Sequence, residues 1–217
     1  TLVKEGKVKE VMCAYNRFEG DPCCGSDQLL MHILREEWGY EGIVVSDCGA
    51  INDFYKEKGG HKTHPDAASA SADAVLSGTD LECGGSYKSL KESVEKGLIK
   101  EEDIDVSVKR LLKARFELGE MDDLEDVSWS KIPYSVVASA KHDSLALDMA
   151  HKSIVLLQNK NNILPLKKEG LKIAVMGPNA NDSVMQWGNY NGTPAQTSTI
   201  LQGIQAAVGK DAQVMYV

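Results

Sequence analysis

Short apolar runs alternate with amphipathic stretches along the first half of the chain. The runs Val11–Ala14 and Ile43–Ser46 have the length and composition of strands that are buried on both faces. Apolar residues then recur at helical spacing from Leu29 to Trp38, after the N-cap candidate Ser26. The other elements predicted for this half are a helix over 66–77, a short strand over 79–83, and helices over about 86–97 and 101–118. Alternation of strand and helix predicts parallel strands with crossover helices, which is an α/β fold.

The pattern changes in the second half of the chain. Residues 119–140 are acidic, lack periodicity and contain Pro133, so we interpret them as a linker. A helix is predicted over about 141–157, and a strand within 171–180. Residues 212–217 have the pattern of a further strand that is only beginning.

These elements predict two domains and a connection. The first domain is expected over residues 1–118, the linker over 119–140 and the second domain over 141–217. The first half contains too few strands for a closed barrel, and the second half stops within a sheet. We therefore expect a chain that is incomplete at both ends.

Polar residues directly follow each of the three predicted strands. They are Tyr15 and Asn16 after the first strand, Asp47 after the second, and Glu82 and Cys83 after the third. Because the carboxyl ends of parallel strands meet at one edge of a sheet, we expect these side chains at a common rim. A carboxylate placed like Asp47 serves as a nucleophile, a metal ligand or a phosphoacceptor, or else as a helix N-cap or salt-bridge partner. The position alone leaves these uses open.

Composition and charge bear on whether the chain binds nucleic acid, a membrane or a metal. The formal net charge is -8, and the basic residues form no run, which argues against a nucleic-acid partner. No apolar stretch approaches the length of a membrane span, so we expect no membrane partner. The five cysteines contain no C-x-x-C pair, and we interpret His61 and His64 as solvated loop residues without metal-ligand spacing. We therefore expect no metal site and no cofactor.

Six segments together resemble glycoside hydrolase family 3 in order and spacing. They are VMCAYN (11–16), GIVVSDCGA (42–50), SGTDLECG (77–84), VKRLLKARFELG (108–119), HKSIVLLQNKNNILPL (151–166) and KIAVMGPNA (172–180). The resemblance covers essentially the whole chain. It implies that residues 1–118 are the C-terminal part of a (β/α)8 TIM-type barrel, and that residues 141–217 are the start of an α/β sandwich domain.

The resemblance also implies a role for each matching position. Asp47 matches the catalytic nucleophile, and Tyr15 matches the tyrosine that lines the sugar subsite beside it. Met12, Cys48 and Cys83 are expected to contact the substrate. Many β-glucosidases of the family carry Trp where this chain has Cys48. The Asp-Cys form resembles the β-xylosidase and arabinofuranosidase branch, in which the two cysteines can form a disulfide at the subsite floor.

A retaining glycosidase needs a second carboxyl group, about 5 to 5.5 Å from the nucleophile, that protonates the leaving oxygen. The family takes this acid/base Glu from the second domain, and we expect it to lie outside this chain. Glu82 is interpreted as a strand-end residue and not as the acid. The loop 185–194 resembles the second-domain loop that approaches the barrel mouth, so Trp187 and Asn189 are expected near the sugar.

The predicted activity is that of a retaining hydrolase acting on terminal non-reducing β-linked sugars, above all a β-xylosidase. The expected partners are an oligosaccharide or aryl glycoside, and the family's role in polysaccharide degradation implies a periplasmic or extracellular location. A β-glucosidase or an α-L-arabinofuranosidase of the same family is the nearest alternative. A different class is a receiver-type domain in which Asp47 accepts a phosphoryl group, but no acidic pair follows an earlier strand to hold Mg²⁺.

Overall fold

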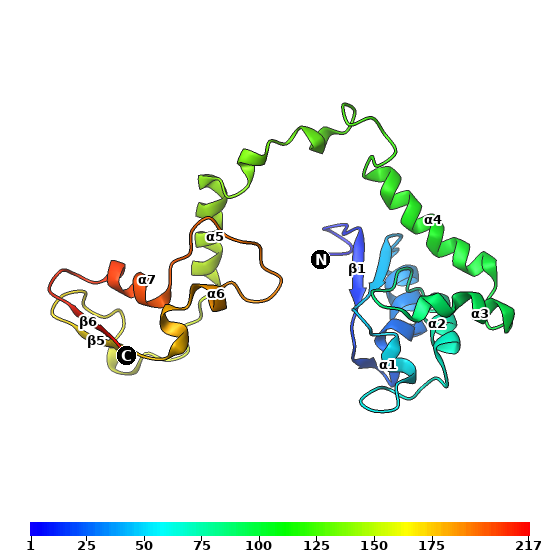
Figure 1. Ribbon diagram of the computed structural model, residues 1–217, viewed down its shortest axis with the longest axis horizontal. Helices are drawn as coiled ribbons and strands as arrows, with labels where there is room; N and C mark the ends of the chain where they lie inside the picture. The colour runs from blue at the N-terminus through cyan, green and yellow to red at the C-terminus, as the bar shows by residue number, and fades with distance from the viewer. The chain divides into compact units, whose positions relative to one another are not determined.

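The computed structural model describes residues 1–217 and divides the chain into two units, Thr1–Lys131 and Ile132–Val217 (Figure 1). The division falls within the segment 119–140 that the sequence predicts as a linker. The boundaries predicted on either side of this segment stay predictions. The elements of the first unit are β1 (Glu10–Cys13), β2 (Arg17–Phe18), β3 (Asp21–Pro22), η1 (Cys23–Gly25), η2 (Gln28–Glu37), β4 (Ile43–Ser46), α1 (Asn52–Tyr55), α2 (Ala67–Leu76), η3 (Ser86–Ser89), α3 (Leu90–Glu95), α4 (Glu101–Glu117) and η4 (Ser128–Lys131).

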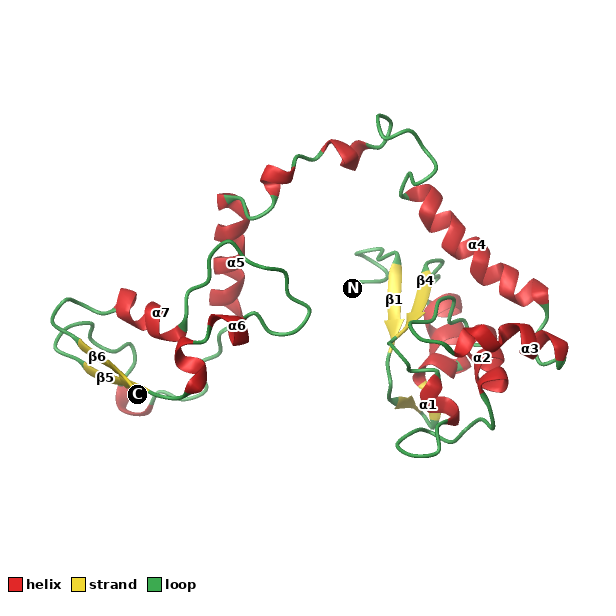
Figure 2. Cartoon of the chain, viewed as in Figure 1, coloured by secondary structure: helices red, strands yellow, loops and turns green.

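A parallel pair of strands forms the centre of the first unit. β1 and β4 run side by side with Cys13 opposite Ser46 (Figure 2). The third predicted strand is reduced to a single parallel bridge, between Leu81 and Val45. The reason is that the amide of Cys83 donates to the hydroxyl of Ser46 at 3.1 Å, where a continuing ladder would offer a backbone carbonyl.

The core of this unit forms where helices cover the parallel pair. Leu30 and Leu34 of η2 are buried, as the helical spacing of this segment predicts. The helix is wound as a π-helix that begins at Gln28. The hydroxyl of Ser26 accepts a hydrogen bond from the amide of Leu29 at 3.3 Å, so its predicted capping contact is present two residues before the helix. The buried apolar cluster consists of Cys13, Cys23, Cys24, Leu30, Leu34, Tyr40, Val44, Ala50, Ile51, Phe54, Ala70 and Ala74.

A buried carboxylate, Asp80, joins three elements of the unit. It accepts hydrogen bonds from the amide of Val44 at 2.9 Å and from Nη2 of Arg35 at 2.6 Å. It also accepts from the hydroxyl of Ser107 at 3.0 Å and from Nη1 of Arg110 at 2.8 Å, both on α4. Burial lowers the pKa of the Arg35 guanidinium, and the charge of Asp80 opposes that lowering. The cluster therefore fixes β4 against η2 and α4.

The second unit has its own parallel pair and a smaller core. Its elements are η5 (Tyr134–Val136), α5 (Ala140–Ser153), η6 (Lys160–Asn162), β5 (Lys172–Val175), η7 (Pro178–Asn181), α6 (Ser183–Gln186), α7 (Ile200–Ala207) and β6 (Gln213–Tyr216). Val175 of β5, Ala180 and Leu201 of α7 form the buried cluster. No helix of the chain combines the length and the apolar character that crossing a membrane requires.

Two helices of the second unit differ from the sequence prediction. The helix expected over about 141–157 ends at Ser153, because Ile154 has extended backbone angles. Helix α7 was not predicted, although a capping box marks its start. In this box the hydroxyl of Thr199 accepts from the amide of Gln202, and the side chain of Gln202 accepts from the amide of Thr199.

Candidate functional site

Asp47 lies directly after β4, where the parallel pair ends. Its amide donates to the carbonyl of Cys13 at 3.0 Å, so the backbone of Asp47 is fixed to the end of β1. Its Oδ1 accepts from the amide of Cys48 at 2.7 Å. Gly49 has φ +78°, a left-handed conformation that glycine adopts without strain and that turns the chain away from the strand. The Asp-Cys-Gly sequence therefore holds this carboxylate at the strand end on a tight turn.

Tyr15 contacts the same turn from the end of β1. Its hydroxyl donates to the carbonyl of Cys48 at 2.6 Å, and 45 % of the residue is exposed. The structure therefore brings Tyr15 to the residue next to Asp47, as expected for two residues of one rim. Met12 lies on β1 itself and is 58 % exposed.

One disulfide lies at this rim and a second lies in the core. Cys48 and Cys83 are joined, as the family resemblance implied, and the amide of Gly49 donates to the carbonyl of Cys83 at 2.6 Å. A second disulfide joins Cys13 to Cys24 within the core, and it was not predicted. Cys23 is a buried free thiol. The turn after β4 is thus bound covalently to the segment that follows Leu81.

Glu82 has a structural role in this rim. Its Oε1 accepts from the amide of Ser86 and its Oε2 from the amide of Tyr87, both at 2.7 Å. These are backbone donors at the start of η3, which have no partner within the helix. Both oxygens of Glu82 are therefore committed to the backbone, which supports its interpretation as a strand-end residue.

The expectation that His61 and His64 are solvated loop residues is wrong. Nε2 of His61 lies 2.8 Å from the carbonyl oxygen of Tyr15, and Nε of Arg17 donates to Nδ1 at 3.2 Å. Nε2 of His64 lies 3.3 Å from Oδ2 of Asp73. Sequence reasoning missed Arg17 altogether, because nothing in the local pattern indicates a partner 44 residues away.

A pocket of about 450 Å³ is lined by Tyr15 and by the turn that follows Asp47. Tyrosine rings, an amide and a carboxylate are groups that bind sugar rings and hydroxyls. The lining residues are Tyr15, Cys48, Gly49, Asn52, Asp53, Tyr55 and Lys56. Three of them belong to α1, so this short helix forms one wall.

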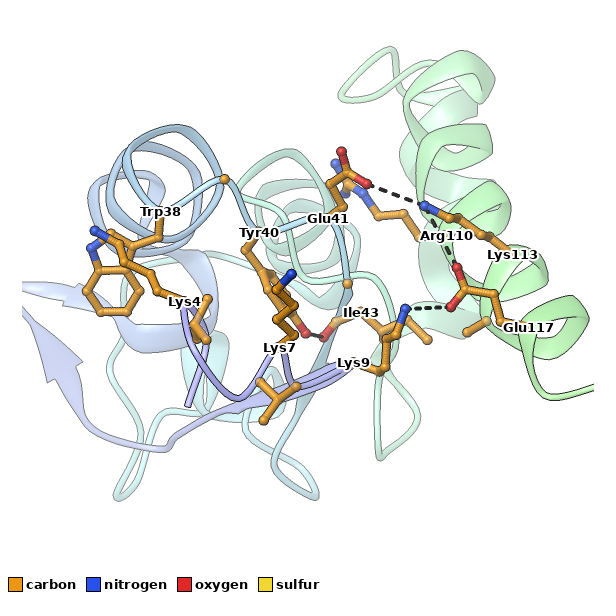
Figure 3. Close-up of a pocket in the computed structure, with 15 residues that line it drawn as sticks. Lys4, Lys7, Lys9, Trp38, Tyr40, Glu41, Ile43, Arg110, Lys113 and Glu117 are labelled. Carbon is orange, nitrogen blue, oxygen red and sulfur yellow. Dashed lines mark hydrogen bonds and ion pairs between the residues drawn. The ribbon is translucent and has the colours of Figure 1, made fainter. Parts of the chain in front are cut away.

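A second pocket of about 450 Å³ lies at the amino ends of β1 and β4 (Figure 3), and Asp47 is not among the residues that line it. Ion pairs line it, with Nζ of Lys9 at 2.8 Å from Glu117 and Nζ of Lys113 at 3.4 Å from Glu41. Burial raises the pKa of Tyr40 to about 12, and its hydroxyl donates to the carbonyl of Ile43 at 2.8 Å. Because α/β proteins carry their sites at the carboxyl ends of parallel strands, we do not regard this pocket as the reaction site.

Trp187 and Asn189 belong to the second unit. Nε1 of Trp187 donates to the hydroxyl of Thr197 at 2.8 Å, and Asn189 is exposed in the loop that follows α6. These contacts lie within the second unit alone. The expectation that both residues approach a sugar stays a prediction.

Comparison with known proteins identifies the family. Residues 1–114 match the model of the glycosyl hydrolase family 3 N terminal domain, and residues 154–215 match that of the family's C-terminal domain. A xylan 1,4-beta-xylosidase from Xylanibacter ruminicola is 58% identical over 100% of this chain, which covers 25% of that protein.

Solved structures show the same relationship. An exo-beta-xylosidase in complex with a xylobiose aziridine activity-based probe has a TM-score of 0.81 and 33% identity, over 98% of this chain and 27% of that one. A beta-glucosidase involved in saponin metabolism from intestinal bacteria has a TM-score of 0.74 and 32% identity, over 95% and 28% respectively. The chain thus spans about a quarter of the length of these relatives. The chain has an α/β fold with Asp47 at the end of its parallel strand pair, and it matches both domain models in order. It therefore belongs to glycosyl hydrolase family 3.

Proposed function

We propose that the protein carrying this chain is a retaining β-xylosidase that releases xylose from the non-reducing ends of xylo-oligosaccharides, with Asp47 as its nucleophile. The observation that carries the proposal is the position of Asp47, fixed to β1 by its amide and flanked by Tyr15 and a disulfide. Family membership and the 58% identity to a xylan 1,4-beta-xylosidase support the same activity.

The proposal includes a finer assignment of the fold. We assign residues 1–118 to the end of a (β/α)8 barrel and residues 141–217 to the start of a sandwich domain. The parallel pairing of β1 with β4, and the parallel bridge from Val45 to Leu81, support a run of neighbouring barrel strands. The carboxyl ends of barrel strands carry the active site in this fold, which is where Asp47 lies.

In the proposed mechanism the carboxylate of Asp47 attacks the anomeric carbon and the bond to the leaving oxygen breaks. A glutamic acid outside these residues gives its proton to that oxygen. The product of this step is a glycosyl ester of Asp47. Water then attacks the same carbon, the glutamate takes a proton from the water, and the ester bond breaks. Two inversions give net retention of the β configuration.

The surroundings of Asp47 suit this role. The hydrogen bond from the Cys48 amide orients the carboxylate, and a backbone donor adds no mobile side chain. Tyr15 presents an exposed ring beside the same turn, and aromatic rings pack against the apolar faces of sugars. The Cys48–Cys83 disulfide connects this turn to the next segment of the rim. A rigid turn keeps the attacking oxygen near its productive geometry.

The disulfides also bear on the location of the protein. Two disulfides within Thr1–Lys131 are typical of proteins in oxidising compartments. They support our proposal that the enzyme acts in the periplasm or outside the cell, where xylan fragments are its proposed substrate. Trypsin accessibility in intact and permeabilised cells tests this location directly.

The nucleophile is tested in the full-length enzyme with an activated aryl β-xyloside. Asp47→Ala should lower kcat by about 10⁴-fold or more, because the covalent step is lost. Asp47→Gly with added azide should form α-xylosyl azide, since azide fills the space of the carboxylate and attacks the same face. Asp105→Ala, an exposed carboxylate on α4, is the matched control and should keep normal turnover. Normal hydrolysis by Asp47→Ala would rule out the assignment.

The choice of sugar is tested separately on the wild-type enzyme. Aryl β-xyloside, β-glucoside and α-L-arabinofuranoside are compared by kcat/KM, and we expect the xyloside to give the highest value. A higher value for one of the other two would assign that activity instead. The receiver-type alternative has lost its basis, because both domain models match one hydrolase family.

A further inference from the structure

One imidazole ties the loop 56–64 to the rim that carries Tyr15. Nε2 of His61 lies 2.8 Å from the carbonyl oxygen of Tyr15, from which it is separated by 46 residues of sequence. The amide of His61 donates to the carbonyl of Asp53 at 2.6 Å, so the loop is also anchored to α1. The ring of His61 packs beside Phe54 with 6.4 Å between the ring centroids. The imidazole is therefore held on several sides.

The partners of the two ring nitrogens determine the protonation state of His61. A backbone carbonyl only accepts hydrogen bonds, so Nε2 carries the hydrogen that Tyr15 receives. Nε of Arg17 only donates, so Nδ1 of His61 is the bare acceptor at 3.2 Å. Both bonds are made together only by the neutral Nε2–H tautomer. An added proton on Nδ1 would set two N–H groups and two positive charges against each other.

Arg17 reinforces this arrangement from β2. Its Nη2 donates to the carbonyl of His61, and its Nη1 donates to the carbonyl of Gly20 at 3.3 Å. One guanidinium thus holds both the ring and the backbone of His61. The fork of an arginine keeps these donors in a fixed relation, which a lysine does not provide.

Few other charged groups face this imidazole. The side chain of Asp53 lies 3.8 Å from Nζ of Lys56, which neutralises it within α1 and the start of the loop. Lys62, the next residue of the loop, is exposed. The ring of His64, 5.4 Å from that of Phe54 between centroids, has Nε2 at 3.3 Å from Oδ2 of Asp73. Arg17 is therefore the ionised partner that the ring of His61 contacts directly.

We propose that neutral His61 is a positioning residue for the sugar subsite, holding the backbone of Tyr15 while the Tyr15 hydroxyl holds Cys48 beside the nucleophile. The inference rests on the proposed function of Asp47 and Tyr15. Protonation of His61 removes the acceptor for Arg17, releases the loop 56–64 and loosens Tyr15. The enzyme accordingly loses activity when His61 takes up a proton.

Three variants of the full-length enzyme test this role by their pH profiles of kcat/KM. His61→Ala removes both bonds, and we expect about a tenfold loss at neutral pH, carried mainly by a higher KM. His61→Gln keeps an amide donor for Tyr15 and an acceptor for Arg17 but does not titrate. It should stay within about threefold of wild type at neutral pH, with an acid limb moved to lower pH. His151→Gln on α5 is exposed and serves as the matched control.

An unchanged acid limb in His61→Gln would overturn the proposal, and so would wild-type kinetics in His61→Ala. Hydrogen–deuterium exchange at the imidazole C2 position, read by mass spectrometry, follows protonation of His61 in the inactive Asp47→Ala enzyme as well. Its midpoint should coincide with the acid limb that His61→Gln loses, and a mismatch counts against the proposal. Failure of the proposed function has a different signature, namely full xyloside hydrolysis by Asp47→Ala.

Discussion

Replacing Asp80 by asparagine tests the cluster that fixes β4. The Asp80 side chain is 0% exposed and that of Arg35 is 6% exposed, so the pair is shielded from water. Asparagine has nearly the same shape, keeps one acceptor oxygen and removes the charge. Asp80→Asn therefore leaves the Arg35 guanidinium buried without its counter-ion. It also turns the NH₂ group of asparagine toward N–H donors that bound a carboxylate oxygen in the wild type.

The expected loss follows from this burial. Breaking a buried ion pair by removing one partner costs about 3 to 5 kcal/mol, because a charge stays buried and unpaired. Loss of the Asp80–Arg110 pair adds less to this cost, because 24% of the Arg110 side chain is exposed to water. For a domain of about 150 to 250 residues, 1 kcal/mol corresponds to roughly 2 to 4 °C. The transition of the unit that contains Asp80 should therefore fall by roughly 6 to 20 °C.

Differential scanning calorimetry of the full-length protein measures this shift. Asp105→Asn removes the same charge from the exposed face of α4 and should melt within about 2 °C of wild type. Arg35→Met combined with Asp80→Asn should recover part of the loss, because no buried guanidinium then lacks a partner. A melting temperature of Asp80→Asn within about 2 °C of wild type would refute the reasoning.

Three further outcomes follow from the electrostatics and the disulfides. Hydrogen bonds from the amide and hydroxyl of Ser69, together with Lys96, lower the pKa of the N-cap residue Asp66 from 3.8 to about 2. The ionised Asp66 therefore stabilises the fold above pH 3.8, and this stabilisation is lost as the pH falls from 3.8 to about 2. Asp66→Ala should lower the melting temperature at pH 7, and a difference that persists undiminished as the pH falls toward 2 would contradict the assignment. Brief reduction and alkylation should label Cys48 and Cys83 before the buried pair of the core, as peptide mass spectrometry would show, and simultaneous labelling would contradict the difference in burial. Opening the Cys48–Cys83 bond, which spans 35 residues, should lower the free energy of unfolding by about 4 kcal/mol.

The elements that the sequence predicts best are those whose signal is local. The strand at Ile43–Ser46 is an apolar run between turn residues, and the helix expected over 101–118 is observed as Glu101–Glu117. The third strand is shortened by a side chain, since the hydroxyl of Ser46 takes the amide of Cys83. Helix α7 has only 8 residues, and its capping box was the one available signal.

The sequence predicts only those parts of the candidate site that follow from local patterns. Tyr15 and Asp47 follow strands, so their meeting at one rim follows from the parallel topology. The contact of His61 with Tyr15 and Arg17 joins segments more than 40 residues apart, and no local pattern encodes it. The pairing of Cys13 with Cys24 is likewise one of several disulfide pairings that five cysteines permit.

The pairing of Cys13 with Cys24, and not with Cys23, affects how the native disulfides form. Cys23 and Cys24 are neighbours in the chain and both are buried, but only Cys24 is joined to Cys13. During oxidative maturation Cys13 meets two adjacent thiols, and an isomer bonded to Cys23 is converted to the native form by attack of the neighbouring thiolate. Oxidation that is fast and irreversible would trap the isomer. The yield of native protein therefore depends on a thiol buffer or isomerase that permits exchange, as well as on an oxidant.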